Sequence, residues 1–481
     1  MIDKQEDRTN LREYIGRLLE DLQIEQERRP LRLALQMGYL SYVRLFIESQ
    51  RRSSLQEHFP YAGFPMEWSR EDEEMDTQQR IWQLSYQMQY CSSVVEEGHF
   101  MEEAQLIENG KWADRLCRLI DWASDHADWE EGMPRVFGRI LEEMICQIYS
   151  FGNSGIFLTP DVLTRMIMEM VEKQDKNIMW NPSCRAGEFL TAAYEKFPQW
   201  ELRGAESEKE LRILSQMLQF YYGAGVGNIA VEDALEHTED MEYDVIVSNL
   251  PVGEVDASEQ NRFFVPTRKI QLQYLQQIME HLKDDGQAFI IVTEGTLFKF
   301  DAEMKVRERL VEKFRMEGVI SLPADAFLPY TGSKASILVF SGKARKKQEK
   351  IWFYELEDPG YTLDKYRQQT ESSQIPHLLD AWKKRSSMEE LWNGQLQEGI
   401  RKNQWDNPVP ERWQESHFWF ADVDTVRKND YNLTVGRYKP WKEKQEQTAE
   451  SPLELLNQLT QMEKETMEQI QELLEMTKEY E

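Results

Sequence analysis

Residues 177–190 read NIMWNPSCRAGEFL and contain the features that decide the fold. Residues 177–181 are predicted as a short strand, Pro182 and Gly187 mark a turn, and the residues after the turn open a helix. A strand that passes through a glycine-containing turn into a helix is typical of a Rossmann-like unit, whose strand ends gather a ligand. The stretch therefore predicts a binding site at the carboxyl edge of a parallel sheet.

The same alternation of strand and helix continues to about residue 345. Further β-rich runs lie at residues 200–206, 228–232, 244–248, 287–293, 318–322 and 336–340, with helical stretches between them. Strands that alternate with helices indicate a doubly wound, mostly parallel sheet. We therefore expect an α/β fold with a Rossmann-like domain over residues 137–345.

The remaining residues are expected to form three further regions. Residues 1–136 are predicted as a helical N-terminal domain, because apolar residues recur at helical spacing. Residues 346–450 form a mixed, charged C-terminal extension, and residues 451–481 are predicted as one amphipathic helix. The apolar side of such a helix needs a cover. The pattern leaves open whether this helix folds back on its own chain or pairs with another subunit.

The composition limits the class of protein. Of 481 residues, 41% are hydrophobic and 30% are charged, which is typical of a globular protein. There is no apolar run long enough to span a bilayer and no secretory signal pattern, so we expect a cytoplasmic protein without membrane contact. The four cysteines and seven histidines stand apart, so neither a disulfide framework nor a metal site is expected.

The charge balance bears on nucleic-acid binding. Lysine and arginine number 57 against 86 aspartates and glutamates, which gives a net charge of −29. A protein that binds DNA by itself usually presents a basic face. The basic clusters here, at residues 343–350 and 383–385, are also typical of solvated loops. We therefore expect that a partner supplies most of the DNA contacts or that the chain does not bind DNA tightly.

Polar residues follow four of the predicted strands, in segments 181–190, 204–206, 232–235 and 244–253. Glu206 lies about 20 positions after the first turn, where an acid commonly binds ribose hydroxyls; the alternative is an ordinary exposed acid. Asp233 ends the third strand, with a helix cap as its alternative role. Asn249 ends the fourth, in the sequence SNLPVG, with a turn cap as its alternative role.

The order and spacing of these segments resemble the N6-adenine DNA methyltransferases, and most of all the modification subunits of type I restriction–modification systems. In that family the first motif reads Asp-Pro-x-Cys-Gly-x-Gly-Gly-Phe-Leu and the fourth reads Asn-Pro-Pro-aromatic. An upstream Gly-x-x-aromatic-Thr-Pro element is similar to residues 155–160. Downstream, the family pattern is matched within residues 282–340, 352–354 and 429–438, so the resemblance covers about residues 137–438.

The resemblance implies S-adenosylmethionine as the cofactor. The residues that would line its pocket are Phe157, Thr159, Pro160, Asn181, Cys184, Gly187, Glu206 and Asp233. Glu206 would bind the ribose of the cofactor and Asp233 its adenine. Thr159 and Pro160 are also typical of a plain helix start, with Thr159 as the N-cap. Cys184 is also typical of a buried structural residue.

The resemblance also implies a catalytic segment and partners. Asn249, Leu250, Pro251 and Val252 would hold a target adenine that is flipped out of the duplex. The Asn249 side chain and the Leu250 carbonyl would accept the hydrogens of its amine and orient the nitrogen toward the methyl group. The implied partners are a DNA-specificity subunit, packed against the terminal helix, and a second modification subunit. DNA would be reached through this complex.

The chain departs from the family pattern at the positions closest to the chemistry. Asn181 replaces the leading acid, and Arg185 and Glu188 replace two glycines that allow close approach of the backbone. Leu158 stands where the family has an aromatic residue. We expect the Arg185 side chain either to fill the methionine end of the pocket or to point to solvent.

In the fourth motif, Leu250 and Val252 replace a proline and an aromatic ring. The loss of the ring removes base stacking of about 1–3 kcal/mol, and the loss of the proline removes a fixed φ. These changes favour a non-catalytic scaffold or regulatory subunit. The retention of Glu206, Asp233 and Asn249 favours an active adenine methyltransferase. A small-molecule methyltransferase is disfavoured because the downstream match is to enzymes that modify DNA.

Overall fold

The computed structural model describes a defined part of the chain, namely residues 15–17, 30–49, 52, 110–127, 129, 135–150, 158–172, 177–223, 228–230, 234–236, 241–256, 261–342, 349–364, 367–401 and 416–440. The predicted terminal helix, Phe157 and Asp233 lie outside these residues. One compact unit comprises residues 1–394 and 415–438, and a second comprises residues 395–414 and 439–481. The elements below belong to the first unit, apart from the last turns of one long helix.

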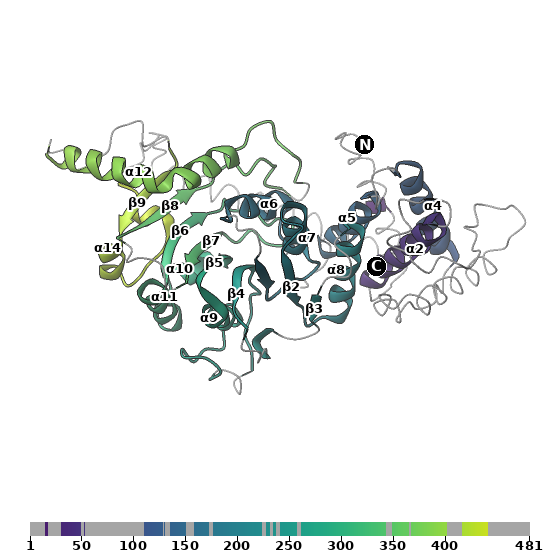
Figure 1. The fold of residues 1–481 in the computed structure, drawn as a ribbon, viewed down its shortest axis with the longest axis horizontal. Helices are drawn as coiled ribbons and strands as arrows, with labels where there is room; N and C mark the ends of the chain where they lie inside the picture. Colours follow the sequence, from purple (N-terminus) through teal and green to yellow (C-terminus); the bar gives the residue numbers. More distant parts are fainter. Residues whose placement is uncertain are drawn as a thin grey trace, which may run out of the picture. The chain divides into compact units, whose positions relative to one another are not determined.

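A central sheet organises this unit (Figure 1). In the described part of the chain its strands follow the order β3-β2-β1-β4-β5-β7-β6-β8-β9. Their bounds are β1 Ile178–Asn181, β2 Glu201–Ala205, β3 Asn228–Ala230, β4 Tyr243–Asn249, β5 Leu282–Thr293, β6 Arg315–Ser321, β7 Ala335–Ser341, β8 Lys350–Glu355 and β9 Phe418–Asp422. Strands β1 to β5 pair in parallel, while β7 is antiparallel to both β5 and β6.

The predicted α/β architecture is confirmed. Each of the seven predicted strand segments forms a strand of the sheet, from β1 to β7. The C-terminal extension adds two further strands to the same sheet, because β8 pairs in parallel with β6 and β9 pairs antiparallel with β8. Strand β7 is buried along its whole length, as expected for a strand with both faces covered.

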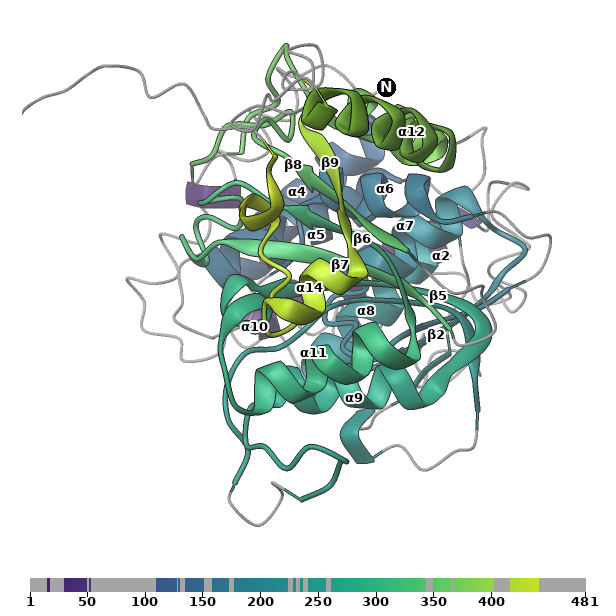
Figure 2. The same cartoon turned by 90° about the vertical axis from the view of Figure 1, so that its left-hand side faces the viewer.

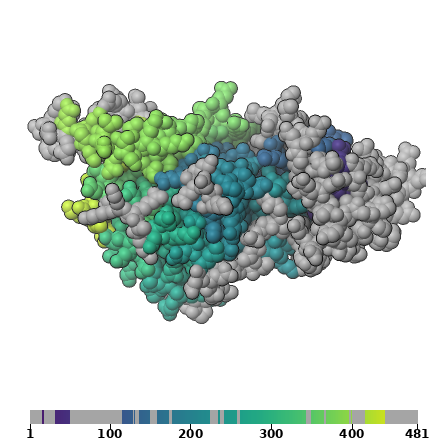
Figure 3. Space-filling view, in the orientation of Figure 1, coloured from purple at the N-terminus to yellow at the C-terminus, as the bar shows by residue number. Residues whose placement is uncertain are grey.

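Helices cover both faces of the sheet (Figures 1 and 2). On one face lie α6 (Asp161–Met170), α7 (Glu188–Lys196), α8 (Lys209–Tyr221) and α12 (Ile375–Arg401). On the other lie α9 (Ile270–His281) and α11 (Ala302–Lys313). Trp382 joins α12 to the sheet: its ring meets Phe289 and Trp352, and its indole nitrogen donates to the Met170 carbonyl at 2.9 Å. In Figure 3 the light green segment containing α12 forms a strip along the surface.

Short elements complete the unit. They are η3 (Ala234–Glu236), α10 (Glu294–Phe298), α14 (Val423–Lys428) and η5 (Val435–Tyr438). α10 directly follows β5, so it begins at the carboxyl edge of the sheet. In the described residues no helix is both long and apolar enough to cross a membrane.

The N-terminal helices share a hydrophobic core with α8. They are α2 (Pro30–Ser49), α4 (Gly110–Asp125) and α5 (Val136–Ser150), and the first two confirm the helical spacing in residues 31–46 and 112–122. The shared core includes Leu40 and Leu141 from these helices and Met217 from α8. Tyr221 of α8 donates its hydroxyl to the Gly38 carbonyl. The helical region therefore packs directly against the helix that joins β2 to β3.

Candidate functional site

The strand ends bring the predicted site residues together. β1, β2 and β4 are parallel neighbours that end at Asn181, Ala205 and Asn249. Because parallel strands end at one edge of a sheet, the segments that follow them meet there. The carboxyl edge of the sheet is therefore the candidate site, as the sequence predicts.

The turn after β1 is tightly packed. The Cys184 amide donates to the Ala205 carbonyl at 3.0 Å, and the Gly187 amide donates to the Cys184 carbonyl at 2.7 Å. Gly187 has φ 86°, and a Cβ there would lie 2.3 Å from Ser215 Oγ. Only glycine fits this position without a shift of the structure. Cys184 is buried, and burial raises the pKa of its thiol well above its usual range, as is typical of a structural cysteine.

Glu206 is a buried acid that holds this turn. Its Oε2 accepts from the Arg185 amide and its Oε1 from the Glu208 amide, both at 2.9 Å. Burial raises the pKa of its carboxyl, while the backbone donors and the Arg185 charge oppose that change. The alternative of an ordinary exposed acid is therefore excluded.

Arg185 occupies the interior of the site. Its φ is 51°, in the left-handed region that favours glycine, and its side chain is only 5% exposed. Its positive charge lowers the pKa of both Glu188 and Glu206. The alternative that Arg185 points to solvent is therefore wrong.

Glu188, at the second altered glycine, joins two parts of the site. Its Oε1 accepts from the Thr159 amide at 3.1 Å and so ties the start of α7 to the segment before α6. Burial raises the pKa of the Glu188 carboxyl to about 7, against the opposing effect of Arg185. Glu188 therefore combines a fixed position with a carboxyl that takes up a proton near neutral pH.

Thr159 does not cap α6, so that alternative is wrong. The helix begins at Asp161, and Pro160 takes the N-cap position, with its carbonyl accepting from Leu163 and Thr164. The Thr159 hydroxyl instead accepts from Asn249 Nδ2 at 3.1 Å, and both residues are buried. The upstream element is thereby bound to the end of β4.

Asn181 suits its surroundings better than an acid would. It is buried at the end of β1. With its amide nitrogen turned toward β4, the side chain donates to the Val247 carbonyl at 3.1 Å and to Ser248 Oγ at 3.3 Å. An ionised carboxylate has no hydrogen to donate. The departure from the family pattern thus creates a bridge between β1 and β4.

We call the predicted catalytic segment, residues 249–252, the clamp; it has no aromatic ring, and Leu250 in it makes an additional backbone hydrogen bond. The Leu250 amide donates to the Ile291 carbonyl of β5 at 3.2 Å, a hydrogen bond that proline cannot make. Leu250 is buried, Pro251 is half-buried, and Val252 is 52% exposed. Beyond the clamp, the Ile270 amide donates to the Gly253 carbonyl at 3.1 Å. Asn249 stays at the end of β4, and an exposed valine stands at position 252 where the family has an aromatic ring.

Residues without an assigned role in the sequence analysis also reach the site. The Tyr330 hydroxyl donates to the Cys146 carbonyl of α5 at 3.3 Å, and the Arg367 guanidinium lies 4.9 Å from the Tyr330 ring. Burial is the main cause of the raised pKa of Tyr330, and the Glu188 charge adds to it. Tyr330 was matched only as part of a family pattern. No sequence signal identified Cys146 or Arg367, because their contacts depend on the tertiary fold.

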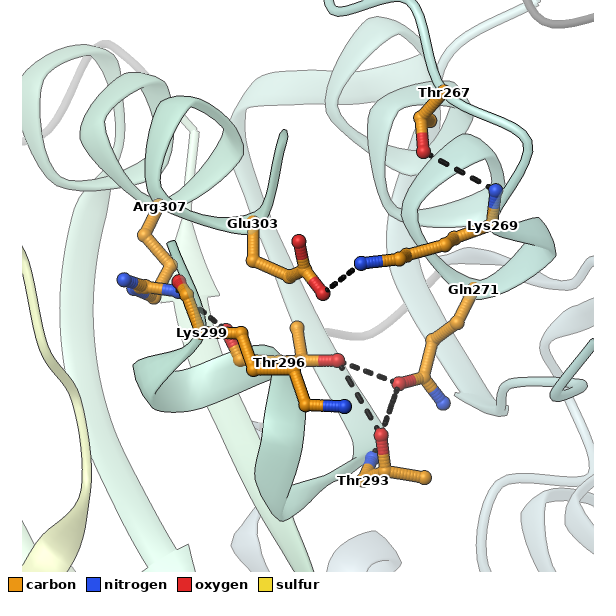
Figure 4. Close-up of polar contacts among 8 residues, drawn as sticks. All are labelled: Thr267, Lys269, Gln271, Thr293, Thr296, Lys299, Glu303 and Arg307. Carbon is orange, nitrogen blue, oxygen red and sulfur yellow. Dashed lines mark hydrogen bonds and ion pairs between the residues drawn. The ribbon is translucent and has the colours of Figure 1, made fainter. Parts of the chain in front are cut away.

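Arg307 of α11 holds the end of α10, the helix that follows β5 (Figure 4). It is fully buried, and burial lowers the pKa of its guanidinium to about 10. The guanidinium donates to the carbonyls of Thr296 and Lys299 at 2.8 Å, of Tyr431 at 2.8 Å and of Asp430 at 3.3 Å. Arg307 and residues 429–433 match the family pattern, and the structure shows that they belong to one junction.

Comparison with known proteins agrees with this fold. The family model described as N-6 DNA Methylase matches residues 133–447. The chain belongs to this family. S-adenosylmethionine is the cofactor expected for it. The predicted resemblance is thereby confirmed at the level of the family.

Methylase subunits of type I restriction enzymes are among its relatives. The EcoEI methylase subunit of Escherichia coli is 29% identical over 277 residues, which cover 53% of this chain and 55% of that protein. The MjaIX methylase subunit of Methanocaldococcus jannaschii is 22% identical over 335 residues, or 64% of this chain and 56% of that protein. The chain spans about half the length of the curated relatives it matches.

Solved structures share the fold. A type I restriction–modification methyltransferase subunit from Streptococcus thermophilus superposes with a TM-score of 0.63 at 16% identity, covering 89% of this chain and 99% of that chain. A chain of another type I system gives a TM-score of 0.61 at 21% identity, with 94% and 95% coverage.

Proposed function

We propose that this chain is a non-catalytic member of the family that acts in the cytoplasm as a structural or regulatory modification subunit. Its partners would be a DNA-specificity subunit and a second modification subunit, with DNA reached through the complex. The observation that carries the proposal is the burial of Arg185 at a positive φ in the turn after β1, with a charge that lowers the pKa of Glu188 and Glu206.

The residues present do not fit S-adenosylmethionine. That molecule carries positive charge on its sulfonium and ammonium groups, and a family site offers it carboxylates and a backbone free of side chains. Here the Arg185 guanidinium already supplies positive charge to the carboxylates, from within the protein. Asn181, where the family has an acid, is engaged with β4. These features support the proposal that the Arg185 side chain takes the place of the cofactor.

The altered residues also serve the fold, which supports a scaffold. Glu188 binds the Thr159 amide and Leu250 extends the pairing of β4 with β5. In both cases the substituted residue makes a hydrogen bond that the family residue cannot make, since glycine has no carboxylate and proline no N–H. A site that was merely decaying would not be expected to gain such contacts.

An active methyltransferase is the second candidate. It is favoured by Gly187, which keeps its left-handed φ, and by Glu206 and Asn249, which keep their places at the ends of β2 and β4. In that case Glu206 and Asp233 would bind the cofactor and Asn249 would orient the adenine amine.

The transfer of labelled methyl groups from S-adenosylmethionine to DNA, with a type I specificity subunit that co-purifies with the chain, separates the two candidates. We expect no transfer by the wild-type complex. Transfer that appears in a variant combining Arg185→Gly, Leu250→Pro and Val252→Phe would identify the positions at which activity was lost. Arg165→Ala, on the exposed side of α6, is the matched control and is expected to leave transfer absent. Robust transfer by the wild type would overturn the proposal.

The partner proposal has its own test. Co-purification of the specificity subunit with the full chain is compared with co-purification by a chain that ends before Pro452. We expect recovery to fall when the terminal segment is removed. Unchanged recovery would contradict a role for residues 451–481 in that contact.

A further inference from the structure

A cluster of polar side chains joins three elements of the C-terminal extension. It lies where β8 ends and where α12 and β9 begin, in elements that lie side by side (Figures 1 and 2). We call it the histidine junction, and its members are Tyr354, Glu357, Gln374, His377 and His417. The centres of the two histidine rings are 6.4 Å apart. The sequence analysis gave these residues no role, because they stand far apart in the chain.

Gln374, directly before α12, has a side-chain amide whose orientation is fixed. Its Oε1 accepts from the Glu357 amide at 2.8 Å and from the Asp358 amide at 3.2 Å. Its backbone amide donates to the Asp358 carbonyl at 2.9 Å. Because two donors hold the side-chain oxygen, the side-chain nitrogen has to face His417. It lies 3.2 Å from Nε2 and 3.4 Å from Nδ1 of that ring.

The contact between Gln374 and His417 requires a neutral ring. The side-chain nitrogen of glutamine only donates, so it needs a ring nitrogen that carries no hydrogen. A neutral imidazole has one such nitrogen and a protonated imidazole has none. Glu357 Oε2 lies 3.4 Å from His417 Nδ1, and its negative charge favours the protonated ring. Proton uptake by His417 therefore removes the contact with Gln374 and strengthens the one with Glu357.

The other groups of the junction leave His417 as the ring that takes up the proton. His377 Nδ1 lies 3.0 Å from the Tyr354 hydroxyl. Burial, and then the neighbouring His417, lower the pKa of His377, while Asp380 opposes this change. Burial, and then the Glu357 charge, raise the pKa of Tyr354, so its hydroxyl keeps its hydrogen. Histidine rings change their charge between about pH 8 and about pH 5, so the contact is sensitive to pH in that range.

The backbone at His417 depends on being held. Its φ is 56°, in the left-handed region that favours glycine. Its carbonyl accepts from the Glu355 amide at 2.8 Å, directly before β9 begins. A non-glycine residue keeps this conformation only where its surroundings hold it. The loss of the Gln374 contact thus removes one of the restraints on the start of β9.

We infer that the histidine junction is a pH-sensitive switch, which ties the start of β9 to the start of α12 while His417 is neutral and releases this tie when His417 is protonated. Residues 395–414 of the second unit lie between α12 and β9 in the chain, so proton uptake loosens the two elements that flank them. The inference goes beyond the proposed function and depends on neither a cofactor nor a partner.

Hydrogen–deuterium exchange of the full chain at about pH 7.5 and about pH 5.5, corrected for the chemical exchange rate at each pH, tests the inference. We expect the amide protection of residues 355–358 and 416–420 to fall roughly fivefold at the lower pH, which is the effect of one hydrogen bond. The carboxyls of Glu142 and Glu188 cannot cause this loss. Burial raises the pKa of both, so they stabilise the folded state on acidification.

Three variants assign the effect to the junction. His417→Asn keeps an acceptor for Gln374, tolerates the left-handed backbone and does not titrate, so its protection should be the same at both pH values. Gln374→Glu offers a carboxylate to the protonated ring, so its protection should rise on acidification. His126→Asn changes an exposed histidine that stacks on Trp122, outside the junction, and should keep the wild-type dependence on pH.

Three outcomes would overturn the inference. The first is equal protection of these residues in the wild type at the two pH values. The second is a wild-type dependence on pH in His417→Asn, which would assign the effect to another group. The third is a loss of protection on acidification in Gln374→Glu. Each variant is compared with itself at the two pH values, so a general loss of stability does not imitate the expected result.

Discussion

Two of the turns that hold non-glycine residues at positive φ, at residue 185 and at residues 430–431, differ in how an arginine side chain is used. Asp430 and Tyr431 both have φ 54°. The buried Arg307, which lies outside this turn in the sequence, donates hydrogen bonds to both of their carbonyls. In the turn after β1, Arg185 has φ 51°, and its own side chain goes into the interior of the site. Each such residue costs about 1–3 kcal/mol and persists only where the surroundings hold it.

The two turns differ in whether the arginine stabilises the fold or takes the position of the cofactor. The 430–431 turn joins the C-terminal extension to α10, so the arginine there serves the fold. The Arg185 turn adjoins the family's cofactor position, where glycine would fit the same backbone without cost. Arg307 should therefore be indispensable for folding, and Arg185 should be replaceable.

Loss of Arg307 should have the largest effect. Arg307→Leu removes the donor to four backbone carbonyls, at residues 296, 299, 430 and 431, and we expect the free energy of unfolding to fall by about 3–5 kcal/mol. Urea denaturation measures the change. Arg427→Ala, which removes a surface ion pair with Glu312, is the control and should cost under about 1 kcal/mol. Equal losses in the two variants would contradict the role given to Arg307.

The pH dependence of stability should report the Glu188 carboxyl. Its pKa in the folded state is raised from 4.5 to about 7, so the folded state binds its proton more tightly than the unfolded state does. Stability should therefore fall as pH rises from about 4.5 to 7, by at most about 3 kcal/mol from this group. Glu142, whose pKa burial also raises to about 7, should contribute in the same direction.

Two glutamine variants show how much of this pH dependence of stability comes from each of the two carboxyls. Glu188→Gln and Glu142→Gln should each make the stability profile flatter between pH 4.5 and 7. In Arg185→Gly the fall should extend to higher pH, because the charge that lowers the pKa of Glu188 is gone. A profile that is the same in wild type and Glu188→Gln would show that the carboxyl is not buried as described.

A smaller effect is expected for Gly187→Ala. The added Cβ would lie 2.3 Å from Ser215 Oγ, at φ 86°, so we expect a loss of about 2 kcal/mol in the free energy of unfolding. Ser215→Ala removes the clashing oxygen and should restore part of that loss in the double variant. If the double variant is no more stable than Gly187→Ala alone, the packing described for this turn is wrong.

The smallest effect should come from Arg185→Gly. Glycine relieves the left-handed strain, while the loss of a buried side chain and its charge acts in the opposite direction. The net change should stay within about 1 kcal/mol of the wild type. Thermal or urea denaturation at neutral pH measures it. A loss comparable to that of Arg307→Leu would mean that both arginines serve the fold, which removes the distinction between the turns.

The sequence predicted the sheet well because each strand of residues 177–340 carries its own local signal. The apolar runs that become β4 and β7 are short and bounded by turns or helices, and the positions of Gly187, Glu206 and Asn249 follow from the strand ends. The addition of β8 and β9 to the same sheet was not predicted, since pairing between distant segments leaves no periodic signal.

The side-chain contacts of the site were harder to predict. The Thr159 hydroxyl could not be assigned to Asn249 from sequence, because 90 residues separate them along the chain. For Arg185 the sequence left two orientations open, because the burial of its side chain depends on all the segments that meet at the carboxyl edge of the sheet. The roles of Tyr330, Cys146 and Arg367 depend on three elements that meet only in the folded protein.

Calorimetric titration of the wild-type chain with S-adenosylmethionine tests the central claim most directly. If Arg185 fills and neutralises the cofactor position, the wild type should give no binding heat at millimolar cofactor, and Arg185→Gly should give saturable heat with its fold intact. Saturable heat from the wild type would contradict the account, because it would show that the pocket accepts the cofactor with Arg185 in place.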